Sequence, residues 1–312
     1  MTVGLSGALL KKLALGRNTL GDVFSEVLVG VQSGIDDVHV MREVATAPDG
    51  IVKLHSERED ADVPIEVAIA KPLLTGQDVS RYEIPISNHR CVYPYYNDNG
   101  RTRILEETIF RSKFPQAYSY LKRHQAYLTE IRRRQKTNPS YWYSCHRSRD
   151  MGVFERERII SPEISKGCNF TVAPVGIYHN TQVYSFVPDE TRKESQFYWL
   201  GILNSKVLWW FLTQTGTVLR GGYFRFKTNY LRPFPIPVIE PTNKAEQDAH
   251  DRIVSLVEQM LDLHRQRAAV QTPHEQTALE RQIAATDSMI DRLVYDLYEL
   301  TDAEVELVNG TC

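Results

Sequence analysis

The densest group of side chains suited to chemistry is a basic stretch at residues 101–150, which holds 12 Lys and Arg against 4 Asp and Glu. Aromatic residues are interleaved with these cations, as where Arg132-Arg133-Arg134 is soon followed by Trp142. Phosphates attract cations, while arginine forks and aromatic faces can contact bases, so this composition suits nucleic acid. A solvated helix face is the alternative interpretation of the same stretch.

A second cluster runs from Arg220 to Lys227 and contains two kinds of side chain in alternation. One set is Tyr223, Arg225 and Lys227, and the other is Phe224 and Phe226. On a strand the two sets would lie on opposite faces, so we predict buried phenylalanines and a cationic face turned toward a ligand. The preceding Gly221-Gly222 would let the backbone approach a groove or a phosphate. An edge strand kept soluble by its charges is the alternative.

Formal charge is unevenly distributed along the 312 residues, although the net charge is only −2. Residues 1–70 carry 6 basic against 11 acidic side chains (−5), residues 71–240 carry 25 against 14 (+11), and residues 241–312 carry 6 against 14 (−8). A basic middle between two acidic ends indicates a surface that binds a polyanion.

The elements that would carry these residues follow from hydrophobic periodicity and turn residues. We expect a short helix over 5–15, strands over 65–69, 89–95 and 158–161, helix over 104–134 with a boundary at Phe114-Pro115, paired strands over 169–187 that turn at His179-Asn180, and a buried helix over 197–212. This mixture predicts an α/β fold.

The run from Pro233 to Pro237 is not expected to join any regular element, because proline lacks a backbone donor. We place a domain boundary there, between a unit over 1–238 and a helical unit over 241–308. In the second unit apolar residues recur at spacings of three and four. They are Ile253, Leu256, Met260 and Leu263, then Leu279, Ile283, Thr286, Ile290, Leu293, Leu297 and Leu300. This pattern predicts an antiparallel helical hairpin, a coiled-coil-like arm.

Capping signals divide this arm into helices. Thr272, Pro273 and Glu275 form a capping box for its second helix, and Thr301-Asp302-Ala303-Glu304 forms another that opens a short final helix. The arm is expected to act as a spacer or docking element, and a homodimer through it is an alternative use.

Recognisable catalytic motifs are missing from the sequence. It has no GxGxxG or GxxxxGK[ST] loop, no HExxH, no GxSxG and no acidic-x-Lys triplet, so we predict no catalytic and no metal-binding residue. Asn138-Pro139-Ser140-Tyr141 resembles the Asn-Pro-Pro-Tyr loop of adenine-N6 methyltransferases. It follows a basic run rather than a buried apolar strand, and we interpret it as a solvated turn.

The cysteines and the N-terminus indicate a cytoplasmic protein. Cys91, Cys145, Cys168 and Cys312 lie far apart, which argues against a disulfide framework and a zinc site. Leu9-Leu10 is followed at once by Lys11-Lys12, which does not fit a signal peptide, and the apolar runs are shorter than a membrane helix requires.

Six blocks of the sequence, in order, are similar to the C-terminal specificity domain of TaqI-like and type IIG restriction-modification enzymes. They are residues 30–37 (GVQSGIDD), 71–82 (KPLLTGQDVSRY), Trp142-Tyr143 with Arg147, 200–206 (LGILNSK), 235–237 (PIP) and 293–301 (LVYDLYELT). The similarity extends over roughly 20–308. The first block departs from the family's Gly-x-x-Thr-Gly-x-Asn loop, because Ser33 replaces the usual Thr and Asp37 stands near where Asn or an aromatic residue is common.

The resemblance implies an α/β target-recognition domain followed by a helical arm, as in type I specificity subunits. It implies duplex DNA as a partner, together with an N6-adenine methyltransferase or restriction endonuclease module on the same chain or another. That module would bind S-adenosylmethionine, and no cofactor is expected in this chain. Such a chain is either part of a longer enzyme or a separate specificity subunit.

Sequence-specific recognition of duplex DNA is therefore the leading hypothesis. The predicted DNA-binding residues are Gln32, Ser33, Lys71, Arg81, Arg132, Arg133, Arg134, Lys136, Trp142, Arg147, Arg220, Tyr223, Arg225 and Lys227. Two alternatives are a nuclease or methyltransferase in its own right, with unfamiliar motifs, and an assembly scaffold built on the helical hairpin.

Overall fold

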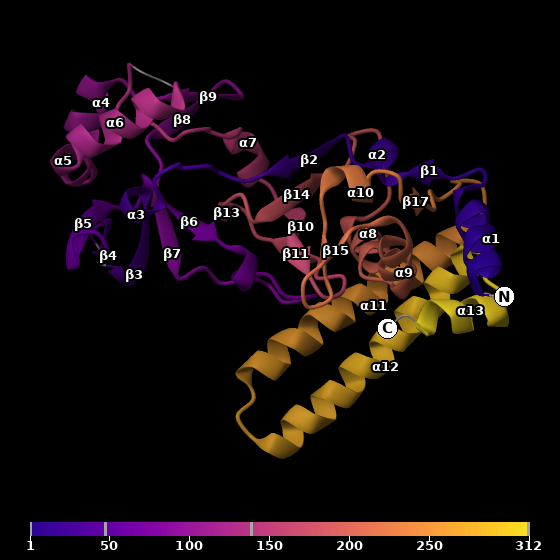
Figure 1. Ribbon diagram of the computed structural model, residues 1–312. Coiled ribbons are helices and arrows are strands. Elements are labelled where there is room, and N and C mark those ends of the chain that lie inside the picture. Colours follow the sequence, from indigo (N-terminus) through magenta and orange to yellow (C-terminus); the bar gives the residue numbers. More distant parts are fainter. Residues whose placement is uncertain (1, 47–48, 138–139, 311–312) are drawn as a thin grey trace.

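The computed structural model describes residues 2–46, 49–137 and 140–310, whose arrangement is drawn in Figure 1. A lobe with a six-stranded sheet adjoins a body with a four-stranded sheet, and two long C-terminal helices project from that body. The prediction of an α/β fold followed by a helical segment is confirmed at this level. Within the described ranges, none of the helices has the length and apolar character to cross a membrane.

The lobe is built on a sheet with strand order β13-β6-β7-β3-β4-β5. Its strands are β3 (Val40–Thr46), β4 (Ile51–Ser56), β5 (Ala61–Glu66), β6 (Ala70–Leu74), β7 (His89–Val92) and β13 (Tyr178–His179). All pairs are antiparallel except β13 with β6. Val52 and Leu54, two residues apart on β4, share one core with Leu121 and Leu128 because alternate strand residues face the same side.

Three helices cover this core, instead of the single helix predicted over 104–134. They are α4 (Glu107–Lys113), α5 (Pro115–Arg123) and α6 (Gln125–Gln135). The predicted boundary is confirmed, because Pro115 begins α5 at a position that needs no backbone donor. The predicted start is wrong, because Ile104 ends strand β9 (Arg101–Ile104), which pairs with β8 (Tyr95–Asp98).

The body contains a sheet with strand order β12-β10-β14-β2. Its strands are β2 (Glu26–Val29), β10 (Arg158–Pro162), β12 (Thr171–Ala173) and β14 (Val183–Val187). The prediction that 169–187 forms one pair of strands is wrong, because β10 lies between β12 and β14 and pairs with both. The intervening chain leaves this sheet, and His179 pairs with Leu74 of the lobe instead of forming a turn.

Two buried helices, α8 (Gln196–Leu203) and α9 (Lys206–Thr215), replace the single helix predicted over 197–212. The break has a specific cause in Asn204. Its side chain accepts a hydrogen bond from the Phe170 N–H and donates one to the Phe170 carbonyl, both at 2.9 Å. Ser205 then caps α9 by accepting a hydrogen bond from the Leu208 N–H.

Short elements complete the body and its connections. Helix α1 (Thr2–Ala14) confirms the predicted N-terminal helix, and the short turns are α2 (Leu20–Val23), α3 (Asp36–His39), α7 (Met151–Phe154), α10 (Thr228–Leu231) and a 3-10 turn at Gly76–Asp78. The proline-rich run does join a regular element, contrary to prediction. Strand β17 (Pro235–Ile236) pairs with β1 (Asn18–Thr19), which a two-stranded edge sheet permits despite the prolines.

The predicted strand at 223–227 is confirmed only over Tyr223–Arg225, which forms β16 and pairs with β11 (Ile164–Ser165) and β15 (Val218–Leu219). Phe226 is 1% exposed, and its ring lies 5.9 Å from that of Phe170. Phe224 is only half-buried, against Trp209 at 5.2 Å. The two phenylalanines therefore differ in how much they contribute to the core.

The arm consists of α11 (Lys244–Ala269) and α12 (Pro273–Leu297), which lie side by side and run in opposite directions, followed by α13 (Asp302–Asn309) (Figure 1). Thr272 caps α12 and the Thr301–Glu304 capping box opens α13, as predicted. The base of α11 packs against α8 so closely that a Cβ at Gly201 would lie 2.7 Å from Ile253. The core of the body thus continues past residue 238.

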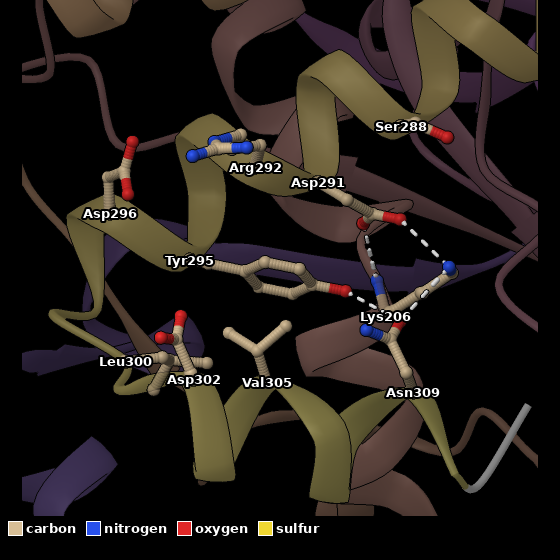
Figure 2. Close-up of a pocket in the computed structure, with 10 residues that line it drawn as sticks. All are labelled: Lys206, Ser288, Asp291, Arg292, Tyr295, Asp296, Leu300, Asp302, Val305 and Asn309. Carbon is tan, nitrogen blue, oxygen red and sulfur yellow. Dashed lines mark hydrogen bonds and ion pairs between the residues drawn. The ribbon is translucent and has the colours of Figure 1, made fainter.

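A small polar cavity of about 360 Å³ marks the junction of α9, α12 and α13. Figure 2 shows Lys206, Asp291, Tyr295 and Asn309 pointing toward one another there. Asp291, whose side chain is 4% exposed, accepts a hydrogen bond from the Lys206 N–H at 3.0 Å, and its second oxygen lies 3.7 Å from the Lys206 ammonium. Lys206 Nζ and the Tyr295 hydroxyl each donate to Asn309 at 3.1 Å. Burial raises the pKa of Asp291 to about 6.

The unequal burial of the β16 phenylalanines gives a stability prediction. Phe226→Ala should lower the free energy of unfolding by about 3–5 kcal/mol, because it empties a fully buried site. Phe224→Ala should have the smaller effect, since part of its ring already contacts water. Urea denaturation of both variants checks this ranking, and equal losses would contradict it.

The pKa of Asp291 gives a prediction of pH dependence. The pKa of Asp291 in the folded protein lies above its ordinary value of 3.8, so the folded protein binds the carboxyl proton more tightly than the unfolded chain does. The stability that this proton contributes is lost as pH rises through about 6. Asp291→Asn removes the titration. Between about pH 4 and pH 7 the variant should therefore gain up to about 3 kcal/mol of stability relative to the wild type. Denaturation of both proteins across this range is the measurement, and a constant difference between them would refute the assignment.

Candidate nucleic-acid interface

A loop near the N-terminus meets two segments of the basic stretch that lie about 100 residues further along the sequence, and we call these residues the opening-loop cluster: 30–34, 132–137 and 146–149. Gln32 and Arg147 exchange backbone hydrogen bonds, with the Gln32 N–H 3.3 Å from the Arg147 carbonyl and the reverse pair at 3.0 Å. The His146 N–H donates to the Ser33 carbonyl at 2.9 Å. The fold therefore joins the first basic stretch to the glycine-containing loop near the N-terminus.

Two arginines, Arg132 buried and Arg149 half-buried, hold this loop. Arg132 is 1% exposed, and its Nη2 donates to the Ser33 carbonyl at 3.0 Å. Nε of Arg149 donates to the carbonyls of Val29 (2.8 Å) and Gly30 (2.9 Å). Burial lowers the pKa of both guanidinium groups, although arginine stays charged in proteins. Their hydrogen bonds fix the path of the loop.

Side-chain size is restricted at the glycine that closes the loop. Gly34 has φ +74, and a Cβ there would lie 2.7 Å from His146, 2.9 Å from Gln135 and 3.0 Å from Arg132. The left-handed backbone and the crowded surroundings both favour glycine. The hydroxyl of buried Ser33 donates to Asp36 and accepts from the Ile35 N–H at 3.0 Å, so the serine is committed to the loop's own structure.

The outer surface of the cluster carries exposed cations. Arg133 and Arg134 are 75% and 68% exposed, and both pair with Glu130, at 2.9 and 2.8 Å. Hydrogen bonds from these two arginines lower the pKa of Glu130 to about 2. Exposed ion pairs contribute little to stability, so phosphates could replace this carboxylate as a partner. Lys136 is exposed at the end of α6, with φ +54.

A second group of cations surrounds strand β16. Arg220 lies exposed beside Gly221 and Gly222, which have φ +83 and +79. The ammonium of Lys166 lies 4.8 Å from the centre of the exposed Tyr223 ring. Sequence reasoning missed Lys166, because only the pairing of β11 with β16 brings it here.

Arg225 and Lys227 have structural contacts within this second group. Arg225 is partly exposed and pairs with Glu163 at 3.9 Å. Lys227 is half-buried at the N-cap of α10. Both remain at the surface, but Arg225 would have to give up its ion pair with Glu163 in order to contact nucleic acid.

The remaining predicted residues lie elsewhere. Trp142 is buried, with its ring 6.1 Å from that of Tyr118. Lys71 is half-buried on β6, where burial lowers the pKa of its ammonium group. Arg81 pairs with Asp287 of α12 at 2.5 Å and donates to the Asn204 carbonyl at 2.8 Å, so it connects the body to the arm.

The described residues show no group of three or more His, Cys, Asp or Glu side chains arranged to hold a metal ion. Asn138 and Pro139, the first half of the motif interpreted as a turn, lie outside the described residues. The buried histidines His39 and His179 have pKa values lowered by burial to about 4 and about 3, so both are neutral at pH 7.

Known type II restriction and methyltransferase enzymes are similar to this chain. It is 24% identical to the type II restriction enzyme and methyltransferase RM.Eco57I of Escherichia coli, over 96% of this chain and 31% of that protein. It is 22% identical to the type II methyltransferase M.BstVI of Geobacillus stearothermophilus, over 88% of this chain and 42% of the relative. For the type II methyltransferase M.XhoI of Xanthomonas vasicola the identity is 22%, over 78% and 40%. The chain thus spans less than half the length of each of these relatives.

A family model gives the assignment that the six sequence blocks predict. The model of the TaqI-like C-terminal specificity domain matches residues 71–236, more than half of the 312 residues. The matched range begins on β6 and ends on β17, so it includes both cation groups but not the arm. The chain therefore belongs to the family of TaqI-like C-terminal specificity domains.

Proposed function

We propose that this chain recognises a specific sequence in duplex DNA for a restriction-modification system. The observation that carries the proposal is the opening-loop cluster, where a loop held by buried hydrogen bonds lies beside exposed cations of the basic stretch at 132–149. Rigid loops suit base recognition, and flexible exposed cations suit phosphate contacts. Within this proposal Arg133, Arg134 and Lys136 contact phosphates.

Three predicted residues take a different role in this proposal. Ser33, Arg132 and Trp142 are buried and would shape the reading surface instead of touching DNA. Arg220, Tyr223 and the newly found Lys166 would form a second contact region, with Arg225 and Lys227 beside it. Lys71 and Arg81 would support the fold.

Chemistry on the DNA belongs, in this proposal, to another module. That module would be an N6-adenine methyltransferase or endonuclease that binds S-adenosylmethionine, and this chain would position it. Residues 1–238 would act as the recognition unit and 241–308 as the docking arm. The arm's charge of −8 over residues 241–312 would repel phosphate, which favours a protein partner for it.

Salt dependence tests the electrostatic part of the proposal. The purified chain should bind duplex DNA with an affinity that falls steeply as salt increases, because bound phosphates release counterions. Lys136→Ala should reduce the slope of log K against log salt by about 1 and weaken binding to all sequences equally. Lys244→Ala, which removes an exposed cation on the arm, is the matched control and should change neither quantity. A flat salt response of the wild type would contradict the proposed phosphate contacts.

Turnover assays test the assignment of chemistry to another module. The purified chain, supplied with S-adenosylmethionine or with Mg²⁺, should neither methylate nor cleave DNA that it binds. Adding the catalytic module of an RM.Eco57I-type enzyme is the positive control for the assay. Methylation or cleavage by the chain alone that is lost in Tyr141→Ala would show that the motif at 138–141 is catalytic.

A further inference from the structure

The bridge between Gln32 and Arg147 places two recognition-type side chains next to each other. These residues exchange both backbone hydrogen bonds, at 3.3 and 3.0 Å, in an antiparallel pair. Directly opposite residues in such a pair carry their side chains on the same face, with Cβ atoms about 5 Å apart. The side chains of Gln32 and Arg147 therefore leave the backbone at adjacent positions on the same face.

Both side chains belong to the outer face of the loop. Val31 and Ser33, on either side of Gln32, are buried at 3%, whereas Gln32 itself is partly exposed, so its side chain lies on the outer side of the loop. Arg147 is exposed. Across residues 2–46, 49–137 and 140–310, the structure contains no hydrogen bond or ion pair made by either side chain. Their donors and acceptors are thus available to a ligand.

The backbone beneath the two side chains is fixed independently of them. Arg132 binds the carbonyl of Ser33, and Arg149 binds those of Val29 and Gly30. A preorganised backbone reduces the ordering entropy lost when the side chains bind. This arrangement suits residues that must discriminate between similar ligands, because small misplacements would weaken discrimination.

We propose that Gln32 and Arg147 form a base-reading pair, an inference that rests on the proposed function. A glutamine amide matches N6 and N7 of adenine, and an arginine fork matches O6 and N7 of guanine in the major groove. Base pairs are spaced by about 3.4 Å, so side chains that start about 5 Å apart reach the same or neighbouring steps. The cognate site should therefore contain an A·T and a G·C pair within two steps of each other.

Selection from a random duplex library, with the 312-residue chain as bait, tests this pair. The wild type should enrich a sequence with both features. Arg147→Lys keeps the charge but loses the fork, and it should reduce preference for guanine at one position by about 5- to 150-fold. Gln32→Ala should do the same for adenine at a position within two steps. Lys136→Ala should leave every base preference intact, and melting curves confirm that the variants fold.

The outcomes separate this inference from the proposed function. A wild type that binds DNA without any sequence preference would overturn both. A selective wild type whose preferences survive Gln32→Ala and Arg147→Lys would overturn only the base-reading pair and leave these residues as phosphate contacts. Preferences lost at positions more than two steps apart would also refute the pair.

Discussion

The six-stranded sheet of the lobe and the four-stranded sheet of the body meet where Gly30 passes the backbone carbonyls of His179 and Asn180. A Cβ at position 30 would lie 2.0 Å from the first carbonyl oxygen and 2.3 Å from the second, so the approach requires glycine. Here the chain leaves β2 of the body, and β13 joins the sheet of the lobe. This contact and the pairing of β13 with β6 join the lobe to the body directly beside the opening loop.

Near Gly30, buried hydroxyl and carbonyl groups accept hydrogen bonds from arginines that composition alone would assign to the surface. Arg158 donates to the Ser185 hydroxyl at 2.9 Å and to the Ile177 carbonyl at 2.6 Å, and burial lowers its pKa to about 10. Neutral His179 shares the same hydroxyl at 2.6 Å. Together with Arg132 and Arg149, Arg158 shows that part of the +11 charge of residues 71–240 holds backbone and hydroxyl groups inside the protein.

Local signals predicted the N-terminal helix, the helices of the arm with their caps, and strand β16, because each depends on residues close together in the sequence. The order β12-β10-β14 and the Arg81–Asp287 ion pair, whose members are 206 residues apart, depend on tertiary packing that no local pattern encodes. The three arginines of α6 show the same limit. Successive helix residues point about 100° apart, so only one of the three enters the interior, and packing decides that it is Arg132.

The arginines under the opening loop bind main-chain carbonyls, which every amino acid possesses. The loop's shape is therefore insensitive to the identity of the side chain at position 32. Evolution could replace that side chain without rebuilding the support beneath. With such an arrangement related proteins can keep the same fold while they prefer different targets, and a single substitution could change that preference.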